Sequence, residues 1–510
     1  MWVNRAVCLF IAGICAAPAS AEAPLSAIDW LSQSVSEPAM PVALPVPKTN
    51  GLAPDATISV KPIGESSIDG VGLLPVSRTG FPRDLWGGTP TDDLARLIRA
   101  ERVDTLPAVQ SLLVKILLAE LAPPTDSDGS GALYLARVDH LLDLGALDQA
   151  LALLSLPGTE SPEAFRRRFD VSLLLGQEDR ACADMRANPQ IAPTFPARIF
   201  CLARGGDWNA AALSLRTGEA LGFIEPDMAV LLARFLDPDL SEGELELAMP
   251  DRPTPLILRM MEAIGQPIPT AALPVAFAHA DLSANTGWKA RIEAGERLAR
   301  TGAVEPNRLL GLYTELKPAA SGGVWDRAAA IRKLDEDLTD GNGAAIADAL
   351  PGLWAMISAA ELEVPFAEIF GPRLARLTLS GDAGALAFRI GLMSSEFEQI
   401  AVQRVAADGV EPFLIGLARG NVDGLAPPDQ LGGAIKAAFL AETALSPDFA
   451  ALIGQKRLGE ALLLALGHIT DGARGDIRDV TSGLRLLREI GLETVARRAA
   501  LELLLLERRG

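Results

Sequence analysis

The chain has 510 residues, with 65 acidic against 46 basic side chains and a formal net charge of −19. Phosphate backbones and anionic lipid surfaces repel such a protein, which argues against nucleic acid and membrane surfaces as partners. A single globular core is unusual at this length, whereas a stack of repeats buries its apolar faces between neighbours.

Residues 1–21 have the features of a secretory signal peptide. Arg5 precedes an apolar stretch from Ala6 to Ala17, and the small residues at 19–21 form a cleavage signal. The apolar stretch is too short to cross a bilayer. We therefore expect cleavage after Ala21, no membrane span in the mature chain and a periplasmic location. Cys15 raises the alternative of lipidation, but Ile14 stands where that signal needs Gly or Ala.

A short amphipathic helix is predicted for residues 22–35. Ile28, Leu31 and Val35 recur at helical spacing, and Trp30 lies beside them. Because an isolated helix of this length is marginal in water, it must dock to persist. Ile28, Trp30 and Leu31 are accordingly the candidate partner-binding residues.

Residues 36–90 form a Pro/Gly-rich linker or extended arm, with nine Pro and seven Gly. Phe81 and Trp86 are large apolar side chains that a pure spacer does not need. Two interpretations stay open: an arm lying partly along a helical body, or a disordered linker with incidental aromatic residues.

Helical periodicity begins at Thr91, which is expected to cap a helix reaching about Val103, and a second helix follows up to Leu121. The loop at 126–131 imitates the opening of a calcium-binding loop, but its twelfth position is Arg137, whose charge opposes the ion. We expect instead that Asp128 or Ser130 caps the next helix.

A repeated pattern defines the next three hairpins. The segments LGALDQALALL, LGQEDRACADM and RGGDWNAAALSL begin at residues 144, 175 and 204. Each has a Gly (145, 176, 205) that can close one helix in the left-handed conformation, an Asp (148, 179, 207) at the start of the next, and a small Ala five residues after the Gly. The glycines are 31 and 29 residues apart, the length of one helical hairpin.

This pattern resembles the tetratricopeptide group of helical repeats in the small residues at the helix contacts, over residues 132–221. The period is shorter, and the Trp and Pro signature positions of that group are not matched. The resemblance implies a helical-hairpin solenoid and a habit of binding proteins. Further helices are expected to end at Gly265, Gly302 and Gly491, and prolines such as Pro351 and Pro372 recur every few tens of residues at the spacing of helix ends. These features predict an all-α array of about two dozen helices in two parts, 91–250 and 251–510.

The sequence contains no recognisable catalytic, cofactor-binding or metal-binding motif, so no such residues are predicted. The three histidines, His140, His279 and His468, lack a second ligand at suitable spacing and are expected to be packed or on the surface. Nucleotide-binding loops and hydrolase elbows are absent from the sequence. The tryptophans at 208, 288, 325 and 354 are expected in the core or between helices.

The sequence therefore predicts a non-enzymatic periplasmic scaffold or adaptor that binds an envelope protein through a curved helical surface. The alternative is a cell-envelope enzyme, such as a peptidoglycan-active hydrolase or lyase with a helical superstructure. Such an enzyme needs a Glu-Ser acid site with Tyr or Gln partners, and neither Tyr134 nor Tyr313 lies near a Glu-Ser pair in the sequence.

A disulfide is predicted between Cys182 and Cys201. They are the only cysteines left after removal of the signal peptide, and an oxidising compartment joins thiols that can meet. Both lie six residues from the ends of one loop, which places them opposite each other on antiparallel helices. Facing Cα atoms on helices about 8 to 10 Å apart are roughly 4 to 5.5 Å apart, within disulfide range.

Overall fold

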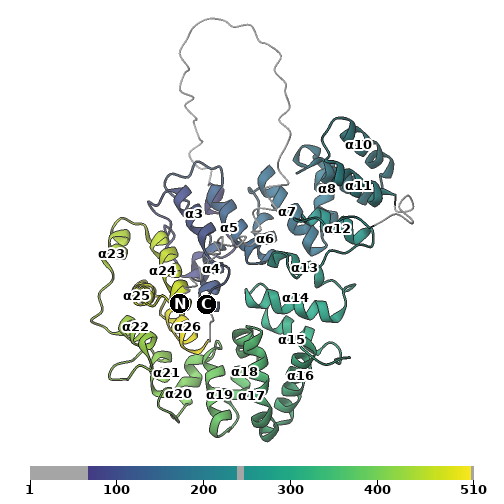
Figure 1. Ribbon diagram of the computed structural model, residues 1–510. Helices are drawn as coiled ribbons and strands as arrows, with labels where there is room; N and C mark the ends of the chain where they lie inside the picture. Colours follow the sequence, from purple (N-terminus) through teal and green to yellow (C-terminus); the bar gives the residue numbers. More distant parts are fainter. Residues whose placement is uncertain (1–66, 238–245, 507–510) are drawn as a thin grey trace, which may run out of the picture.

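The computed structural model describes residues 67–237 and 246–506, and over these ranges the chain is all-helical (Figure 1). From Thr91 onward, helices α3 to α26 confirm the predicted array of about two dozen helices. A single parallel bridge, Leu74 with Ala119, is the extended pairing within the described residues. The signal peptide and the segment holding Ile28, Trp30 and Leu31 lie outside the described ranges.

The helices fall into three consecutive sets. The first set is η1 (Ile68–Gly70), α2 (Val76–Thr79), α3 (Thr91–Ala100), α4 (Pro107–Leu117), α5 (Ala132–Asp143), α6 (Leu147–Leu154) and α7 (Pro162–Leu175). The second set is α8 (Glu178–Ala187), η2 (Pro189–Ile191), α9 (Phe195–Arg204), α10 (Trp208–Ala220) and α11 (Pro226–Leu236). The third set is α12 (Pro255–Ala263), η4 (Val275–Phe277), α13 (Ala278–Asp281), α14 (Trp288–Arg300), α15 (Pro306–Thr314), α16 (Val324–Asp340), α17 (Gly343–Ala359), α18 (Glu363–Ala375), α19 (Gly381–Leu392), α20 (Phe397–Gln403), α21 (Glu411–Ala418), α22 (Gln430–Phe439), α23 (Pro447–Gly454), α24 (Leu458–Ala473), α25 (Val480–Glu489) and α26 (Glu493–Leu505).

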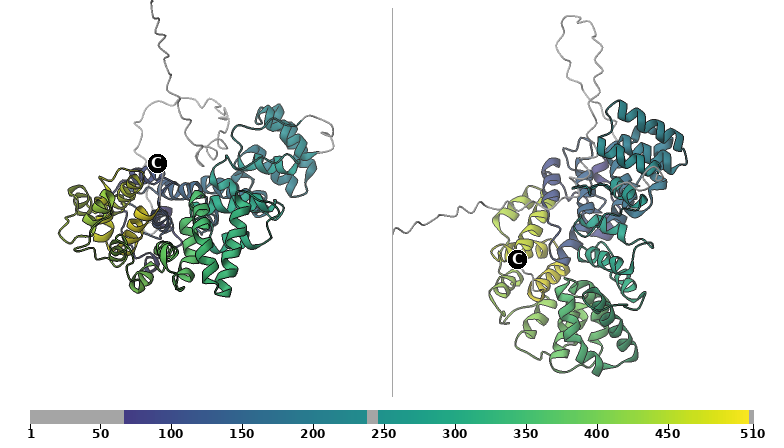
Figure 2. Two further views of the ribbon diagram at one scale, coloured as in Figure 1. Left: turned by 60° about the horizontal axis from the view of Figure 1, so that its bottom comes forward. Right: turned by 45° about the vertical axis from the view of Figure 1, so that its right-hand side comes forward.

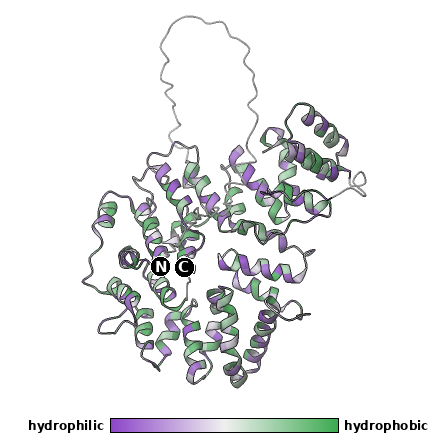
Figure 3. Cartoon of the chain, viewed as in Figure 1, coloured by the Kyte–Doolittle hydropathy of each residue, from purple (hydrophilic) through white to green (hydrophobic). Residues whose placement is uncertain are grey.

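Most helices pack against the next one along the chain, as in a solenoid. Hydrophobic and hydrophilic residues are interspersed along the helices (Figure 3). The largest buried apolar cluster has members from Phe81 to Leu506. The second set departs from this course. Helices α8 to α11 project from the array, and α12 then returns to pack on α7 (Figures 1 and 2). We call α8 to α11 the projection.

The two ends of the array lie against each other, so the array is closed and not a linear solenoid. The indole of Trp86 is fully buried beside Gly459 of α24, whose N–H donates to the carbonyl of Leu85 at 2.8 Å. Further along, the hydroxyls of Thr105 and Thr470 are 2.6 Å apart. We call these contacts between residues 85–108 and helices α24 and α26 the seam.

A buried carboxylate completes the seam at the start of α4. The N–H of Ala108 donates to Glu502 of α26 at 2.9 Å, so a residue 394 positions away caps this helix. A negative charge is favourable there because the first N–H groups of a helix lack partners within the helix. The seam therefore supplies contacts that a linear solenoid would need terminal capping repeats to provide.

Of the predicted arm, residues 67–90 are described and lie along the helices, whereas residues 36–66 lie outside the described ranges. Phe81 and Trp86 are buried, and the guanidinium of Arg137 on α5 donates to four carbonyls of the surrounding chain. These acceptors are Asp69, Val71, Leu117 and Ala119, at 2.8 to 3.2 Å. We call residues 67–76 the strap.

The expected helix caps were wrong at two positions. Thr91 is the first residue of α3 and donates its N–H and hydroxyl to Asp126, which therefore acts as the cap from a distant loop. Neither Asp128 nor Ser130 caps α5. Instead, the carboxylate of Asp69 in the strap accepts a hydrogen bond from the N–H of Tyr134 at 2.9 Å. Carboxylates distant in the sequence thus cap both helices in place of the expected local residues.

Three further local expectations need correction. The first helix ends at Ala100 rather than Val103. In the third repeat the left-handed residue is Gly206, because α9 continues to Arg204 and Gly205 keeps a right-handed conformation. Pro351 and Pro372 lie inside α17 and α18 rather than at helix ends. Proline has no N–H, so the carbonyl one turn before Pro351 lacks its helical donor. Pro351 is exposed, and water can therefore bind this carbonyl.

The seam predicts a specific pH dependence. Burial, together with the charge of Asp471 on α24, raises the pKa of Glu101 from 4.5 to about 8. The folded chain therefore keeps a proton that the unfolded chain loses between these values, and stability should fall as pH rises through this window and level off above it. Glu101→Gln should make the protein more stable than the wild type above pH 8 and equally stable near pH 4.5.

Thermal unfolding across this pH range measures the difference. The surface variant Glu120→Gln is the matched control, because Glu120 is exposed and its substitution should leave the wild-type curve unchanged. A constant offset between Glu101→Gln and the wild type at every pH would contradict the role assigned to the Glu101 proton.

Candidate interaction surface

The three histidines lie at contacts between helices. Burial lowers the pKa of His140 to about 4, and Nε2 of the buried His279 lies 2.7 Å from the carbonyl of Gly145. Nδ1 of His468 is 3.1 Å from the hydroxyl of Ser482. Across residues 67–237 and 246–506, no group of three His, Cys, Asp or Glu could hold a metal ion.

A Tyr–Glu pair that the sequence did not reveal joins α14, α15 and α16. The hydroxyl of Tyr313 donates to Glu296 at 2.6 Å, and Arg327 binds the same carboxylate with two hydrogen bonds. Tyr313 and Glu296 are buried, and the carboxylate is neutralised by the guanidinium. This arrangement joins three helices and leaves the acid no access to a substrate.

A second buried polar cluster joins α5 to α7. Arg167 forms a buried ion pair with Asp139. Its guanidinium donates one hydrogen bond to each oxygen of the Asp139 carboxylate. Burial raises the pKa of the neighbouring Asp170 to about 8. These groups fix the spacing of the two helices at the root of the projection.

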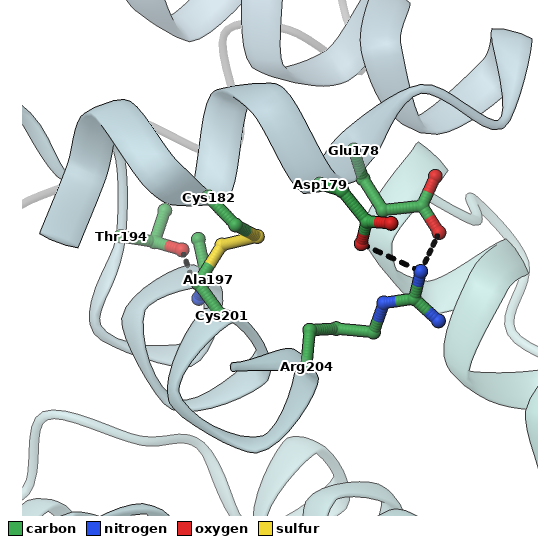
Figure 4. The surroundings of a disulfide bond; sticks show 7 residues. All are labelled: Glu178, Asp179, Cys182, Thr194, Ala197, Cys201 and Arg204. Atoms are coloured by element: carbon green, nitrogen blue, oxygen red, sulfur yellow. Dashed lines mark hydrogen bonds and ion pairs between the residues drawn. A yellow bond between two sulfur atoms is a disulfide. The ribbon is translucent and has the colours of Figure 1, made fainter. Parts of the chain in front are cut away.

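The predicted disulfide is present and holds the first hairpin of the projection (Figure 4). Cys182 on α8 and Cys201 on α9 have Cα atoms 5.0 Å apart, within the range expected from helix geometry. Beside it, Arg204 forms ion pairs with Glu178 at 3.3 Å and Asp179 at 2.7 Å (Figure 4). Covalent and ionic links thus join the two helices at neighbouring turns.

The disulfide predicts a local effect of reduction. Free-thiol titration of the denatured, unreduced mature protein should find no reactive thiol. After reduction, limited proteolysis should cut residues 178–236 first, because the α8–α9 loop of the projection is then no longer closed by a covalent bond. Equal protection of the projection before and after reduction would contradict this local role.

The second hairpin of the projection, α10 with α11, exposes large apolar side chains. Leu213 is 68% exposed, Leu221 61% and Val230 48%. Trp208 is 51% exposed, so its predicted place in the core was wrong. The physical reason is local: Asp207 caps α10 and Trp208 is its first residue, so no preceding turn lies beneath the indole. We call Trp208, Leu213, Leu221 and Val230 the hairpin surface.

The other three tryptophans lie in helix contacts, as predicted. The indole N–H of Trp288 donates to the carbonyl of Leu312 at 2.7 Å, and its ring packs on Trp325 with centroids 5.0 Å apart. Trp354 packs on Phe366 with centroids 5.9 Å apart. Trp208 is therefore the most exposed of these four tryptophans.

A second exposed apolar group lies at the end of α20 and on the loop that leads to α21. Val402, Val405 and Val410 are exposed, and Val405 reaches 85%. The loop is held in place from beneath: the fully buried Glu411 accepts two hydrogen bonds from Arg404 and one from the N–H of Ala407. We call the three valines the loop surface.

Comparison with known proteins identifies no relative for this arrangement. No protein-family model matches the chain, and neither curated proteins nor solved structures show significant similarity. Among the described helices, none is both long and apolar enough to span a bilayer. The candidate residues Ile28, Trp30 and Leu31 lie outside the described ranges, so their contacts stay a prediction.

Proposed function

We propose that the protein is a non-enzymatic scaffold or adaptor of the periplasm that binds other envelope proteins through the hairpin surface and the loop surface. One observation carries the proposal. Of the ten large apolar side chains that are exposed in the described residues, seven lie on these two surfaces. Such grouping is typical of interaction sites, whereas single exposed apolar residues are common on any protein.

The surroundings of both surfaces support binding in preference to catalysis. Each surface stands on ordered structure, the disulfide-linked projection in one case and the Arg404–Glu411 ion pair in the other. A preformed surface loses little conformational entropy on association. Burying one exposed Leu or Val side chain contributes about 1.5 to 3 kcal/mol, so a few such residues can dominate an interface.

Site-specific photocrosslinking in the periplasm tests the proposal. A photoreactive amino acid in place of Trp208 or Val405 should give an adduct with another protein, whereas the same group at the exposed position of Asp92 on α3 should not. Adducts of equal yield at all three positions would contradict the two surfaces. Release of soluble fragments from cell-wall sacculi by the purified protein would favour the enzyme alternative.

The periplasmic location and the cleaved signal peptide need their own measurement. N-terminal sequencing of the protein from a periplasmic extract should begin at Glu22, directly after the predicted cleavage site. Retention of Met1 in the mature protein would contradict secretion by this route.

A further inference from the structure

One face of α10 and the residue that follows it carry a mostly apolar, exposed stripe that includes two residues of the hairpin surface. Leu213, Thr217, Ala220 and Leu221 are all exposed and follow each other at the spacing of one helix face. The opposite side of the helix is packed, with Ala211, Leu215 and Gly218 buried. An amphipathic helix normally turns its apolar face to the core, so α10 has a second apolar face that is suited to another helix.

We infer that residues 22–35 of the same chain dock on this stripe. The segment carries Ile28, Leu31 and Val35 at positions i, i+3 and i+7, which complements a stripe at i, i+4, i+7 and i+8. The contact lies within one chain and is argued without the proposed function. Competition between this segment and a partner protein at the hairpin surface rests on the proposed function.

Charge favours this occupant. Residues 22–35 contain two acids, Glu22 and Asp29, and no basic residue. Arg216 is exposed on α10 directly beside the stripe, and Glu219 is the one acid of this helix. The segment therefore brings a negative charge between its apolar residues to a face with a positive charge at its edge.

The tether is long enough to reach the stripe. Its inner end is fixed at Ser67, whose hydroxyl lies 2.7 Å from that of Ser127 within the network around Asp69. Ser67 caps η1, which packs on α5, and five further packed helix pairs lead from α5 to α10, so at about 10 Å per step the separation is about 60 Å. Residues 36–66 can span about 100 Å when extended.

Tethering also makes weak affinity sufficient. A flexible linker of this kind holds a docking segment at an effective concentration of roughly 1 mM. An intrinsic Kd of about 0.1 mM then gives about 90% occupancy. The loop surface is a poorer match, because Val402 belongs to the last turn of α20 while Val405 and Val410 follow outside a helix, so the three valines do not form a helix-length stripe.

Intrachain photocrosslinking of the complete mature protein, residues 22–510, tests the inference. With p-benzoylphenylalanine in place of Leu213, illumination of the purified monomer should join α10 to a peptide from residues 22–35. The same group in place of Glu219, on another face of α10, is the matched control and should not form this adduct. Leu31→Asp should lower the adduct yield about tenfold, because it removes one buried Leu side chain.

Each outcome decides the inference. A monomeric adduct between residue 213 and residues 22–35 that Leu31→Asp removes supports it. Adducts that join two chains, adducts with other parts of the same chain, or no adduct overturn it. Because Leu31 lies outside the described helices, an unchanged circular dichroism spectrum of Leu31→Asp separates loss of docking from loss of fold. The adducts of Trp208 and Val405 with other proteins are scored separately and test the proposed function alone.

Discussion

Replacing Arg137 with methionine should destabilise the protein by about 3 to 5 kcal/mol, because the change leaves buried acceptors without donors. The guanidinium is fully buried on α5 and donates to carbonyls of both the strap and the α4 region. Burial lowers the pKa of Arg137 to about 10, so the side chain stays charged at neutral pH and binds its acceptors as a cation. Methionine fills part of the volume but donates no hydrogen bond.

Denaturant unfolding of Arg137→Met against Arg99→Met measures the effect. Arg99 is exposed on α3, so its substitution should change stability by less than about 0.5 kcal/mol. Limited proteolysis should also cut residues 67–76 faster in Arg137→Met, because the strap loses its main attachment. A loss below about 1 kcal/mol would show that the carbonyls find other donors.

Gly72 offers an independent route to the same result. A Cβ at this position would lie 2.3 Å from the carbonyl of Ala119, which belongs to the backbone and cannot move aside. Gly72→Ala should therefore release the strap while Arg137 is intact. Agreement between the two variants in the proteolysis pattern would assign the effect to the strap and not to the charge of Arg137.

Features that depend on nearby residues could be predicted from the sequence. The hairpins follow from glycines that take left-handed conformations, as Gly145 and Gly176 do, and from Asp207, which caps α10 as expected. The disulfide was predictable because Cys182 and Cys201 flank one short loop. In each case the residues that make the contact are less than about 30 positions apart, so periodicity and spacing carry the information.

Long-range contacts were beyond sequence reasoning. Glu502 caps a helix 394 residues earlier, and Asp69 takes the capping position that local residues were expected to fill. No pattern in the sequence distinguishes these carboxylates from the many others in an acidic chain. The exposed stripe on α10 could not be predicted either. From the sequence alone its apolar residues are expected in the core, and only the packing of the hairpin shows that they are exposed.

Disruption of the seam should convert the closed array into an open one. Two glycines of α24 form a matched pair of positions with which this contact can be tested. A Cβ on Gly459 would lie 2.7 Å from the ring of the buried Trp86 and 3.0 Å from the carbonyl of Leu85. A Cβ on Gly467 would meet nothing within 4 Å. The same Gly-to-Ala substitution therefore creates a steric clash across the seam at position 459 and fills free space at position 467.

Gly459→Ala should lower stability by about 2 to 3 kcal/mol through overpacking, whereas Gly467→Ala should raise it by about 0.5 to 1 kcal/mol through helix propensity. Hydrogen exchange should rise at residues 85–108 in Gly459→Ala, because the N-terminal helices lose their support from α24, and should stay unchanged in the projection. Equal stabilisation by both substitutions would mean that the two ends of the array are apart in solution. In that case α3 and α4 would have to be stable as the open end of a linear solenoid.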